Sequence, residues 1–514
     1  MRSCAPASLF LHFGASLGCA SCFRRNNVRC RLPLNYKKRF FSSPAASSGE
    51  QANEQLLVVV GAGAAGIYAS IRAKSIAPNL NVLVVEKGKP LSKVKISGGG
   101  RCNVTNGHFV EAVKLAENYP RGNKELRGSF FNAHGPQDTM CWFSDHGVQL
   151  KTEDDGRVFP VSDSSASVVD CLLNEAKRIG VVLQTGKTVS NASVTDNGKF
   201  VLKVEKRTID FVEYVDADYV LVATGSSQQG YSIATQLGHS IIDPMPSLFT
   251  FKIANTELTR LSGVTFQRVK AKLKLDNVHK SIPELTQVGP MLVTHWGLSG
   301  PVILRLSAWG ARELFLSSYT GMLFVDFMPD IHMEDVKCIL FHQRDQLGVW
   351  FFIEDVKYLA FHNEIMISKF QCFFLQKHKA NNFFPPQFGL AKRFWRFLLE
   401  QEGLDGDMPW ASIANSHLNS IALLLKQYPF KVVGKGQFKD EFVTAGGVPL
   451  PEISLSTMES KKQPNLFFAG EVLNVDGITG GFNFQVNAWT GGYIAGTSIG
   501  RLASNYYHLA EEAS

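Results

Sequence analysis

The segment from Leu57 to Gly66 constrains the fold of this chain more than any other. It reads LVVVGAGAAG, a β-branched apolar run that leads directly into the pattern G-x-G-x-x-G. In this pattern the first glycine permits a tight turn from strand to helix, the second lets the backbone approach a pyrophosphate, and the third lets the helix pack close to the strand. The N-terminus of that helix offers unpaired N–H groups to phosphate. The candidate phosphate-binding residues are Gly61, Ala62, Gly63, Ala64, Ala65 and Gly66.

An acidic residue follows at the distance that a dinucleotide site requires. Glu86 ends a second apolar run, residues 82–85, and lies 20 positions beyond Gly66. A carboxylate at that place can accept hydrogen bonds from the ribose of adenosine. Because strand, helix and acid are in register, the segment predicts a dinucleotide-binding site. The alternative is a glycine-rich turn in an ordinary βαβ unit.

The first 49 residues have the composition of an organellar transit peptide. They hold eight basic residues, no Asp or Glu, and many Ser and Ala. We exclude such a segment from fold reasoning and expect a mitochondrial or chloroplast protein. A secretory signal fits less well, because the apolar run near residues 9–17 is interrupted and most basic residues follow it.

Without this leader the chain is electrically neutral. The whole sequence holds 53 basic and 45 acidic residues, so removing the eight leaves 45 of each. The basic character of the full chain therefore gives no reason to expect nucleic acid as a partner. No apolar stretch is long and clean enough to span a membrane. The five cysteines outside the leader show no metal-ligand or dithiol spacing, so we expect neither a metal nor a disulfide.

A second glycine-rich segment, residues 97–106, reads SGGGRCNVTN. Three consecutive glycines favour neither helix nor strand, so this segment predicts a loop. Backbone N–H groups near Gly100 can face an anion there, with Arg101, Asn103 and Asn106 as polar contacts. A plain surface loop is the alternative.

Three further segments support an α/β domain. Residues 164–179 have helical periodicity, and residues 219–225 form an apolar strand that ends in Ala-Thr-Gly at Gly225. Near the C-terminus another apolar strand ends at Gly470 and Glu471, and a glycine-rich turn at 477–481 leads into a helix of small residues. Glu471 can meet a ribityl hydroxyl, and the helix N-terminus can stabilise negative charge on a reduced flavin. The first and last segments therefore predict one domain interrupted by an insertion.

The inserted part divides into two kinds of sequence. Residues from about 246 to 330 alternate short apolar and polar runs with few helix signals, which predicts a β-rich domain. Residues 388–430 read as amphipathic helices, and their aromatic cluster at 394–399 fits a packed core better than a ligand site.

These motifs resemble the BaiN-like flavoproteins, bacterial and plant proteins that include aminoacetone oxidases. The resemblance covers nearly all of residues 55–500, and the chain looks like a plant-type organellar member. The blocks that carry it are VVVGAGAAG, SGGGRCNVTN (97–106), GRVFPVSD (156–163), THWGLSGP (294–301), TAGGV (444–448) and FFAGEVLNVDGITGGFNFQ (467–485).

The resemblance implies an α/β fold: a discontinuous Rossmann-type FAD-binding domain at 54–245 and 436–511, a β-barrel-like insert at 246–347 and a small helical subdomain at 377–435. It implies non-covalent FAD and a redox role, with no assured catalytic acid or base. The residues that it places around FAD are Gly61, Gly63, Gly66, Glu86, Lys87, Arg101, Asn103, Gly470, Glu471, Ile478, Thr479 and Gly480. Gly100, Cys102 and Gly225 complete our candidate set.

One stretch departs from the family pattern. Residues 348–376 are unusually aromatic: eight of the 29 are Trp, Phe or Tyr, against 11% for the chain. Many of the residues have AT-rich codons, so we hypothesise a retained intron translated in frame. The alternative is a genuine aromatic loop whose apolar surface must be buried. Sequencing the transcript across this stretch distinguishes the two.

The sequence leaves three functions open. The first is an FAD-dependent oxidoreductase acting on a small molecule, with O₂ or NAD(P)H as electron partner; an oxidase is favoured because no second G-x-G-x-x-G marks a separate nicotinamide domain. The second is a flavoprotein that modifies RNA, which the neutral charge argues against. The third is an interaction protein that uses FAD for stability alone.

His295 is the candidate catalytic residue. In the block THWGLSGP its imidazole could exchange a proton with substrate near physiological pH, while Trp296 walls the pocket. The alternative is a structural histidine beside a core tryptophan.

Overall fold

The computed structural model describes residues 54–206, 211–255, 257–275, 282–348, 379–382, 384–436 and 443–512. All of them belong to one compact unit, Gly49–Ser514. The expected transit peptide, and all but the first residue of the aromatic stretch 348–376, lie outside these ranges. Within them, no helix is long and apolar enough to cross a membrane.

A seven-stranded sheet joins the two ends of the chain. Its order is β19-β20-β21-β10-β1-β2-β6, and its central strands are parallel. Strand β21 comes from the C-terminal segment, yet it pairs with β10 beside β1. The strands are β1 (Leu56–Val60), β2 (Asn81–Glu86), β6 (Val182–Thr185), β10 (Tyr219–Val222), β19 (Ile453–Ser454), β20 (Glu459–Ser460) and β21 (Leu466–Phe468). This pairing confirms the discontinuous domain expected from the sequence.

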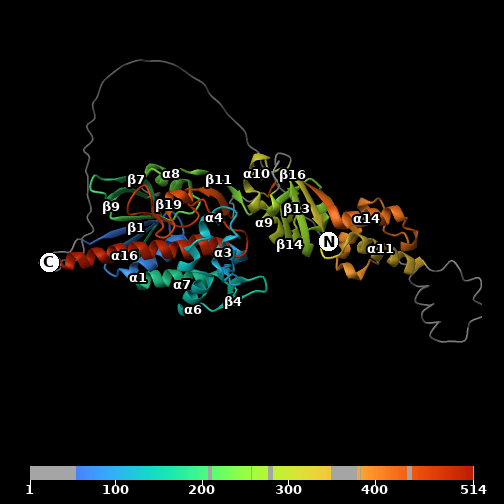
Figure 1. Ribbon diagram of the computed structural model, residues 1–514, viewed down its shortest axis with the longest axis horizontal. Coiled ribbons are helices and arrows are strands. Elements are labelled where there is room, and N and C mark those ends of the chain that lie inside the picture. The colour runs from blue at the N-terminus through green and yellow to red at the C-terminus, as the bar shows by residue number, and fades with distance from the viewer. Residues whose placement is uncertain are drawn as a thin grey trace, which may run out of the picture. The chain divides into compact units, whose positions relative to one another are not determined.

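Two helices from opposite ends of the chain lie side by side on this sheet (Figure 1). They are α1 (Ala64–Ile76) and α16 (Gly491–Glu512). Gly492, Gly496 and Gly500 of α16 repeat every four residues, so they share one face of the helix. A Cβ at Gly496 would lie 2.4 Å from the carbonyl oxygen of Ala69 in α1. Glycine is therefore what allows the two backbones to touch.

Shorter elements surround this sheet. Antiparallel strands form β3-β5-β4 and β7-β8-β9. The bounds are β3 (Thr105–Asn106), β4 (Leu150–Thr152), β5 (Arg157–Pro160), β7 (Lys187–Val194), β8 (Phe200–Lys206) and β9 (Phe211–Ala217). The helices are α2 (Ser92–Ile96), η1 (Ser97–Gly100), α3 (Ala112–Ala116), α4 (Asn123–Leu126), α5 (Phe130–Ala133), α6 (Pro136–Asp145), α7 (Ser165–Arg178), α8 (Gln228–Gln236), η7 (Leu450–Glu452), α15 (Phe482–Phe484) and η8 (Gln485–Thr490).

The inserted part is built on a closed six-stranded barrel, β12-β15-β14-β13-β16-β17. Two strands that pair with each other, β11 (Ile242–Ser247) and β18 (Val443–Gly447), connect it to the first domain. The barrel strands are β12 (Phe251–Ile253), β13 (Thr265–Lys274), β14 (Thr286–Val293), β15 (Gly297–Ser299), β16 (Gly321–Asp326) and β17 (Tyr428–Lys435). The helices of the insert are η2 (Glu257–Leu261), η3 (Pro283–Leu285), α9 (Pro301–Trp309), α10 (Ala311–Leu316), α11 (Met333–Gly348), η5 (Pro386–Phe388), α13 (Lys392–Gln401), η6 (Trp410–Ser412) and α14 (Asn415–Gln427).

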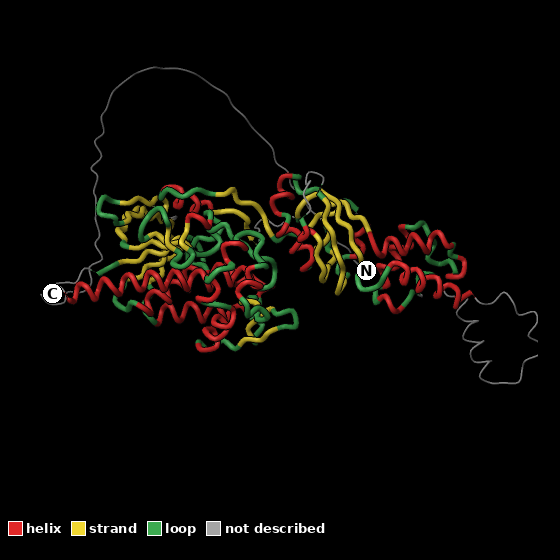
Figure 2. Tube along the Cα trace, viewed as in Figure 1, coloured by secondary structure: helices red, strands yellow, loops and turns green. Residues whose placement is uncertain are grey.

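The barrel and the helices share one hydrophobic core, separate from that of the first domain. Figure 2 distinguishes the strands from the helices that accompany them. Trp395 of α13 stacks on Trp410 at 5.5 Å between ring centroids, and Phe394 packs edge-on against Phe266 of the barrel. The aromatic cluster near residue 395 is therefore core, as the sequence indicated.

Two features of the inserted part differ from the sequence expectation. Residues 428–435, which we assigned to the helical subdomain, form barrel strand β17, because this strand must pair with both β12 and β16 to close the barrel. The stretch 246–330 also contains helices α9 and α10, which its alternating pattern did not reveal.

Candidate cofactor-binding site

The glycine-rich turn between β1 and α1 leaves open space for a ligand. Gly61 has φ +106°, and a Cβ there would lie 2.5 Å from the Ala223 carbonyl oxygen. A Cβ at Gly66 would lie 2.0 Å from the Gly61 carbonyl oxygen. At Gly63, by contrast, a Cβ would meet only that Ala223 oxygen, at 3.9 Å. Two glycines thus permit close packing, and the third borders free space.

The N-terminus of α1 fits a pyrophosphate. Gly63 is its N-cap, no side chain caps it, and its first turn holds no acidic residue. The first N–H groups of a helix have no partner inside the helix, and the helix dipole places positive charge there. Ala64 and Ala65 open this turn without a polar side chain that could compete with phosphate.

Glu86 is held in place by the backbone of the same turn. Its Oε2 accepts the Ala62 N–H at 2.8 Å, and its Oε1 accepts the Gly88 N–H at 2.6 Å. An ionised carboxylate has about four acceptor positions, so capacity remains for ribose hydroxyls. Lys87 beside it is exposed. The structure therefore brings together the glycines and the acid that the sequence predicted.

The loop at 97–106 meets the C-terminal glycine-rich turn. Gly98, Gly99 and Gly100 all have positive φ, so the turn η1 is irregular, and the segment ends in the short strand β3. With its amide oriented to satisfy its neighbours, Asn103 accepts the Gly481 N–H at 2.9 Å. The Asn106 amide donates to the Gly480 carbonyl oxygen at 3.2 Å. Two segments more than 370 residues apart in sequence thus contact each other.

Two predicted residues of this loop have other partners. Arg101 pairs with Glu153 at 2.8 Å and stacks over the Phe159 ring at 3.9 Å. Cys102 is fully buried, and burial raises the pKa of its thiol to about 12. These contacts give Arg101 and Cys102 a role in fixing the loop. They do not place either side chain among the groups around Glu86 or Gly480.

The ends of β10 and β21 gather a buried acid and a lysine. Glu471 follows Gly470 at the end of β21, and a Cβ at Gly225 would lie 3.9 Å from its Oε2. Glu471 accepts the Thr444 N–H at 2.9 Å and pairs with Lys93 at 3.1 Å. Burial raises the pKa of Glu471, and Lys93 opposes that rise. Sequence reasoning predicted Glu471 but missed Lys93, which stands outside the recognised motifs.

The turn at 478–481 precedes one helical run, α15, η8 and α16. Ile478 donates its N–H to the Asn118 carbonyl oxygen, and Thr479 and Gly480 are half-buried. No side chain caps α15. The first turns of this run therefore present N–H groups beside Gly480, which suits a ligand edge that carries negative charge.

A buried glutamine, which the sequence analysis did not single out, fixes this run. The Gln485 carbonyl oxygen accepts hydrogen bonds from Thr105 and Thr139, and its amide donates to Thr490 and to the His134 carbonyl oxygen. Gln485 begins the π-helical turn η8, a distortion frequent at functional sites. Asn483 and Asn487 flank it in the sequence, so its residue type alone gave no signal.

A second buried network joins the first domain to the insert. Asp476 is fully buried and pairs with Arg121, and Ser247 of β11 also binds this carboxylate, at 2.8 Å. Arg121 further donates to the Ala308 carbonyl oxygen of α9 at 2.7 Å. This network links the segment before the glycine-rich turn to both β11 and α9.

His295 and Trp296 occupy the turn between β14 and β15, and both side chains are exposed. A Cβ at Gly436 would lie 3.4 Å from the Trp296 Nε1, and the Gly436 N–H donates to the Thr250 carbonyl oxygen. The turn therefore lies where β12 and β17 join the connecting strands. Within the described ranges, no hydrogen bond ties His295 to a predicted FAD contact. Trp296 is exposed, so the alternative of a structural histidine beside a core tryptophan is wrong for the tryptophan.

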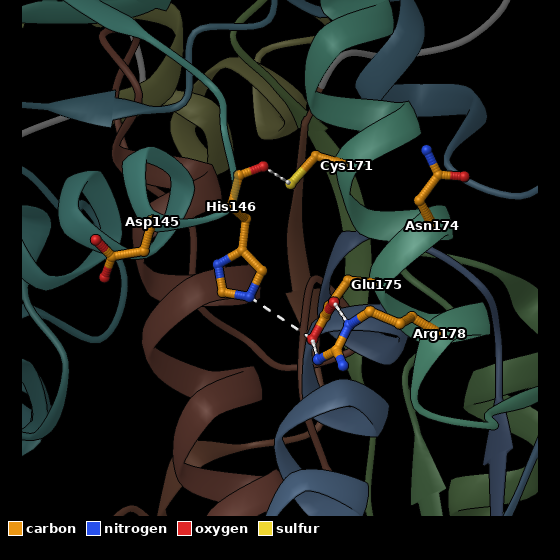
Figure 3. A pocket seen from close by; sticks show the side chains of 6 residues that line it. All are labelled: Asp145, His146, Cys171, Asn174, Glu175 and Arg178. Carbon is orange, nitrogen blue, oxygen red and sulfur yellow. Dashed lines mark hydrogen bonds and ion pairs between the residues drawn. The ribbon is translucent and has the colours of Figure 1, made fainter.

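A separate surface hollow lies between α6 and α7 (Figure 3). Glu175 bridges Arg178 at 2.6 Å and His146 at 3.7 Å, so its charge is already partnered. Burial raises the pKa of Cys171 to about 11, which leaves it a thiol. The lining residues are Asp145, His146, Cys171, Asn174, Glu175 and Arg178. None of them belongs to the candidate cofactor set.

The described residues hold no cluster of metal-ligating side chains, and their four cysteines are free.

The chain is 27% identical to the 3-dehydro-bile acid delta(4,6)-reductase of Clostridium scindens over 85% of this chain and 97% of that protein. It is 27% identical to the ribosomal RNA dihydrouridine synthase of Escherichia coli over 84% of this chain and 95% of that protein. A protein of the latter name from Haemophilus influenzae is 26% identical over 86% of this chain and 98% of its own length.

Among solved structures, a flavocytochrome c3 fumarate reductase matches with a TM-score of 0.44 and 16% identity, covering 88% of this chain and 79% of that one. Residues 55–498 match the family described as HI0933-like protein Rossmann domain. That match spans both parts of the discontinuous domain and the insert between them. The chain belongs to this HI0933-like family of FAD-dependent flavoproteins.

Proposed function

We propose that this FAD-dependent oxidoreductase reduces a carbon–carbon double bond conjugated to a carbonyl group in a small molecule. The observation that supports flavin chemistry is the single cradle built from both ends of the chain: the Gly63 turn, Glu86, and the contact of Asn103 and Asn106 with residues 480–481. The names of the relatives support the substrate class. A delta(4,6)-reductase and a dihydrouridine synthase both add hydrogen to such a double bond.

Bound FAD supplies hydride transfer, and the chain supplies position and charge. The uncapped start of the helical run at Phe482 suits the negatively charged edge of a reduced flavin. Lys93, whose side chain is exposed, pairs with the largely buried Glu471 at the end of β21. Residues 61–66 would hold the pyrophosphate of FAD at the start of α1.

His295 is the proposed proton donor. Its turn lies near Gly436, which follows barrel strand β17. The next described strand along the chain is β18, in which the Thr444 N–H donates to the Glu471 carboxylate. An exposed imidazole could exchange a proton with a substrate bound beside this turn. His295→Gln should keep FAD yet slow substrate reduction by roughly 10²-fold or more. Normal kinetics across the pH range would return His295 to a structural role.

Stopped-flow kinetics test the proposed reaction. The reduced protein is mixed anaerobically with a set of conjugated enones, and in parallel with O₂ alone. The proposal expects faster flavin reoxidation by at least one enone than by O₂. The oxidase hypothesis predicts the reverse, and a protein that uses FAD only for stability predicts slow reoxidation by both. The sequence has no second dinucleotide fingerprint, so it does not identify the electron donor. NADH and NADPH are therefore both tested as donors.

A second candidate substrate is a uridine base within RNA. The specific observation is that two bacterial relatives, almost completely covered by this chain, are named ribosomal RNA dihydrouridine synthases. Incubation of the reduced protein with ribosomal RNA, followed by nuclease digestion and mass spectrometry, measures new dihydrouridine. RNA that gains none in the presence of reduced flavin excludes this substrate.

We also propose that the protein works in an organelle, on the composition of residues 1–49. A fluorescent protein fused to this segment should enter mitochondria or chloroplasts. Diffuse cytosolic fluorescence would contradict the proposal.

A further inference from the structure

Strand β13 carries three lysines on one face. Lys270, Lys272 and Lys274 are exposed, whereas Ala271 and Leu273 between them are buried in the barrel. Successive side chains of a strand point to opposite faces, so the three lysines stand in a row about 7 Å apart. This spacing is similar to that of successive phosphates along a nucleic-acid strand.

The neighbouring strands extend this face. Across the sheet, Lys272 is paired with Phe324 and Lys274 with Met322 of β16. Met322 is in turn paired with Lys431 of β17. Paired residues in antiparallel strands share one face, so half-exposed Met322 and Phe324 lie between the row on β13 and Lys431. We call these residues (270, 272, 274, 322, 324 and 431) the lysine face; β13 and β16 are labelled in Figure 1.

Carboxylates do not neutralise this face. In the part of the chain that the structure describes, none of the four lysines forms an ion pair. The carboxylate paired across the sheet from Lys270, Asp326, is bound by Lys426 at 2.7 Å. Asp330 pairs with Arg268 at the start of the strand. Most protein surfaces intersperse both signs of charge, so an unbalanced row of lysines indicates an anionic partner.

From the sequence, a neutral net charge and the absence of a basic tract speak against nucleic acid as a partner. A neutral total is compatible with a basic face, because the total does not say where charges lie. The alternating K-x-K-x-K of β13 becomes a row of charge only when the residues form a strand. The lysine face is therefore a local feature that the net charge of the chain does not reveal.

We propose that the lysine face binds a single strand of nucleic acid, with phosphates on the lysines and a base on the ring of Phe324. Single-strand binding surfaces combine a basic track with aromatic side chains on which bases stack. The bases of a duplex are already stacked on one another, so none would be free to stack on the ring of Phe324. An acidic protein would not need the regular spacing along β13. The proposal goes beyond the flavin reaction and does not depend on which molecule the flavin reduces.

Fluorescence anisotropy of the full-length, FAD-loaded protein with a labelled 20-nucleotide oligouridine tests the proposal. The measurement is repeated from low to physiological KCl. We expect binding that weakens with salt. The triple variant K270Q/K272Q/K274Q should bind at least tenfold more weakly and lower the slope of log affinity against log salt by roughly 2. Phe324→Ala should weaken binding roughly tenfold and leave the slope unchanged.

The matched control removes three exposed charges from the first domain, as K114Q/K124Q/K177Q. This variant should bind the oligonucleotide like the parent protein. Equal losses in both triple variants would overturn the proposal, as would no binding at low salt. Polyglutamate that competes as well as oligouridine would indicate an acidic protein partner instead, and would also overturn it. FAD content and flavin reduction are measured in every variant, so a failure of the flavin chemistry is seen separately.

Discussion

Two glutamates of the site differ in how their charge is balanced. Glu86 is half-exposed and accepts only main-chain N–H groups, whereas Glu471 is largely buried against Lys93. The free acceptor positions of Glu86 make it the residue whose loss affects FAD most directly. Glu471 instead accepts the Thr444 N–H and pairs with the exposed Lys93, contacts that hold the end of strand β21.

We predict that Glu86→Ala weakens FAD binding. A hydrogen bond to a charged group contributes about 1.5–3 kcal/mol, so losing one raises the dissociation constant at least tenfold. Fluorescence titration of the apoprotein with FAD measures this. Glu459→Ala, which removes a carboxylate elsewhere in the domain, is the control. An unchanged dissociation constant would exclude Glu86 from the site.

His134 should make stability depend on pH. It is 4% exposed, lies 3.0 Å from the Tyr68 hydroxyl, and burial lowers the pKa of its imidazole from 6.5 to about 4. Between these two values the unfolded chain binds more protons than the folded one. The free energy of unfolding should therefore fall as the pH drops from 6.5 to 4, by up to about 3 kcal/mol from this residue.

Urea unfolding at several pH values measures this dependence. In His134→Gln the free energy of unfolding should lose the fall between pH 6.5 and 4 that comes from this residue. In His295→Gln, a substitution at an exposed position, the free energy of unfolding should depend on pH as in the parent protein. A His134→Gln protein with the parent's pH dependence would contradict the assignment.

The sequence predicted the residues that have a fixed place in a motif: the glycines, Glu86, Asn103 and Glu471. It did not predict Lys93, Gln485 or Arg121, each of which has a partner more than 180 positions away in the sequence. Long-range pairs of this kind leave no local pattern. For Arg101 the loop suggested an anion contact, and in the structure its guanidinium pairs with Glu153; its contact with FAD stays a prediction.

Among the elements, the contact of α1 with α16 depends most on side-chain size. We predict that Gly496→Ala destabilises the protein, although alanine favours a helix by about 1 kcal/mol over glycine. The added Cβ would meet the Ala69 backbone, and such overpacking costs about 1–3 kcal/mol. Thermal unfolding with and without FAD measures the change. Asn505→Ala on the exposed side of α16 should not lower Tm, and a raised Tm for Gly496→Ala would contradict the packing.

Elements with a strong local pattern were predicted well, such as β1, α7 and β21. Barrel strand β17 was not, because closure depends on pairing with β12 and β16, which are more than 100 residues away in sequence. Its alternation over Tyr428–Lys435 follows directly on the helical periodicity of α14. Because the hydrophobic pattern changes from helical to alternating with no turn between them, the sequence does not show where helix α14 ends and strand β17 begins.

At the scale of the whole molecule, the flavin domain requires both ends of the chain. Truncation before Leu466 removes β21 and the helical run that packs on α1. We predict a protein that retains the GAGAAG turn but binds no FAD, as measured by its absorbance spectrum. A truncated protein that purifies with a full complement of flavin would refute the discontinuous domain.

The flavin content of the purified full-length protein tests the central claim most directly. The protein is denatured, the released chromophore is identified by HPLC, and its amount is compared with that of the polypeptide. The account predicts FAD, released without covalent attachment, at one molecule per chain. A colourless protein that cannot be loaded with FAD, or one that carries FMN instead, would contradict it.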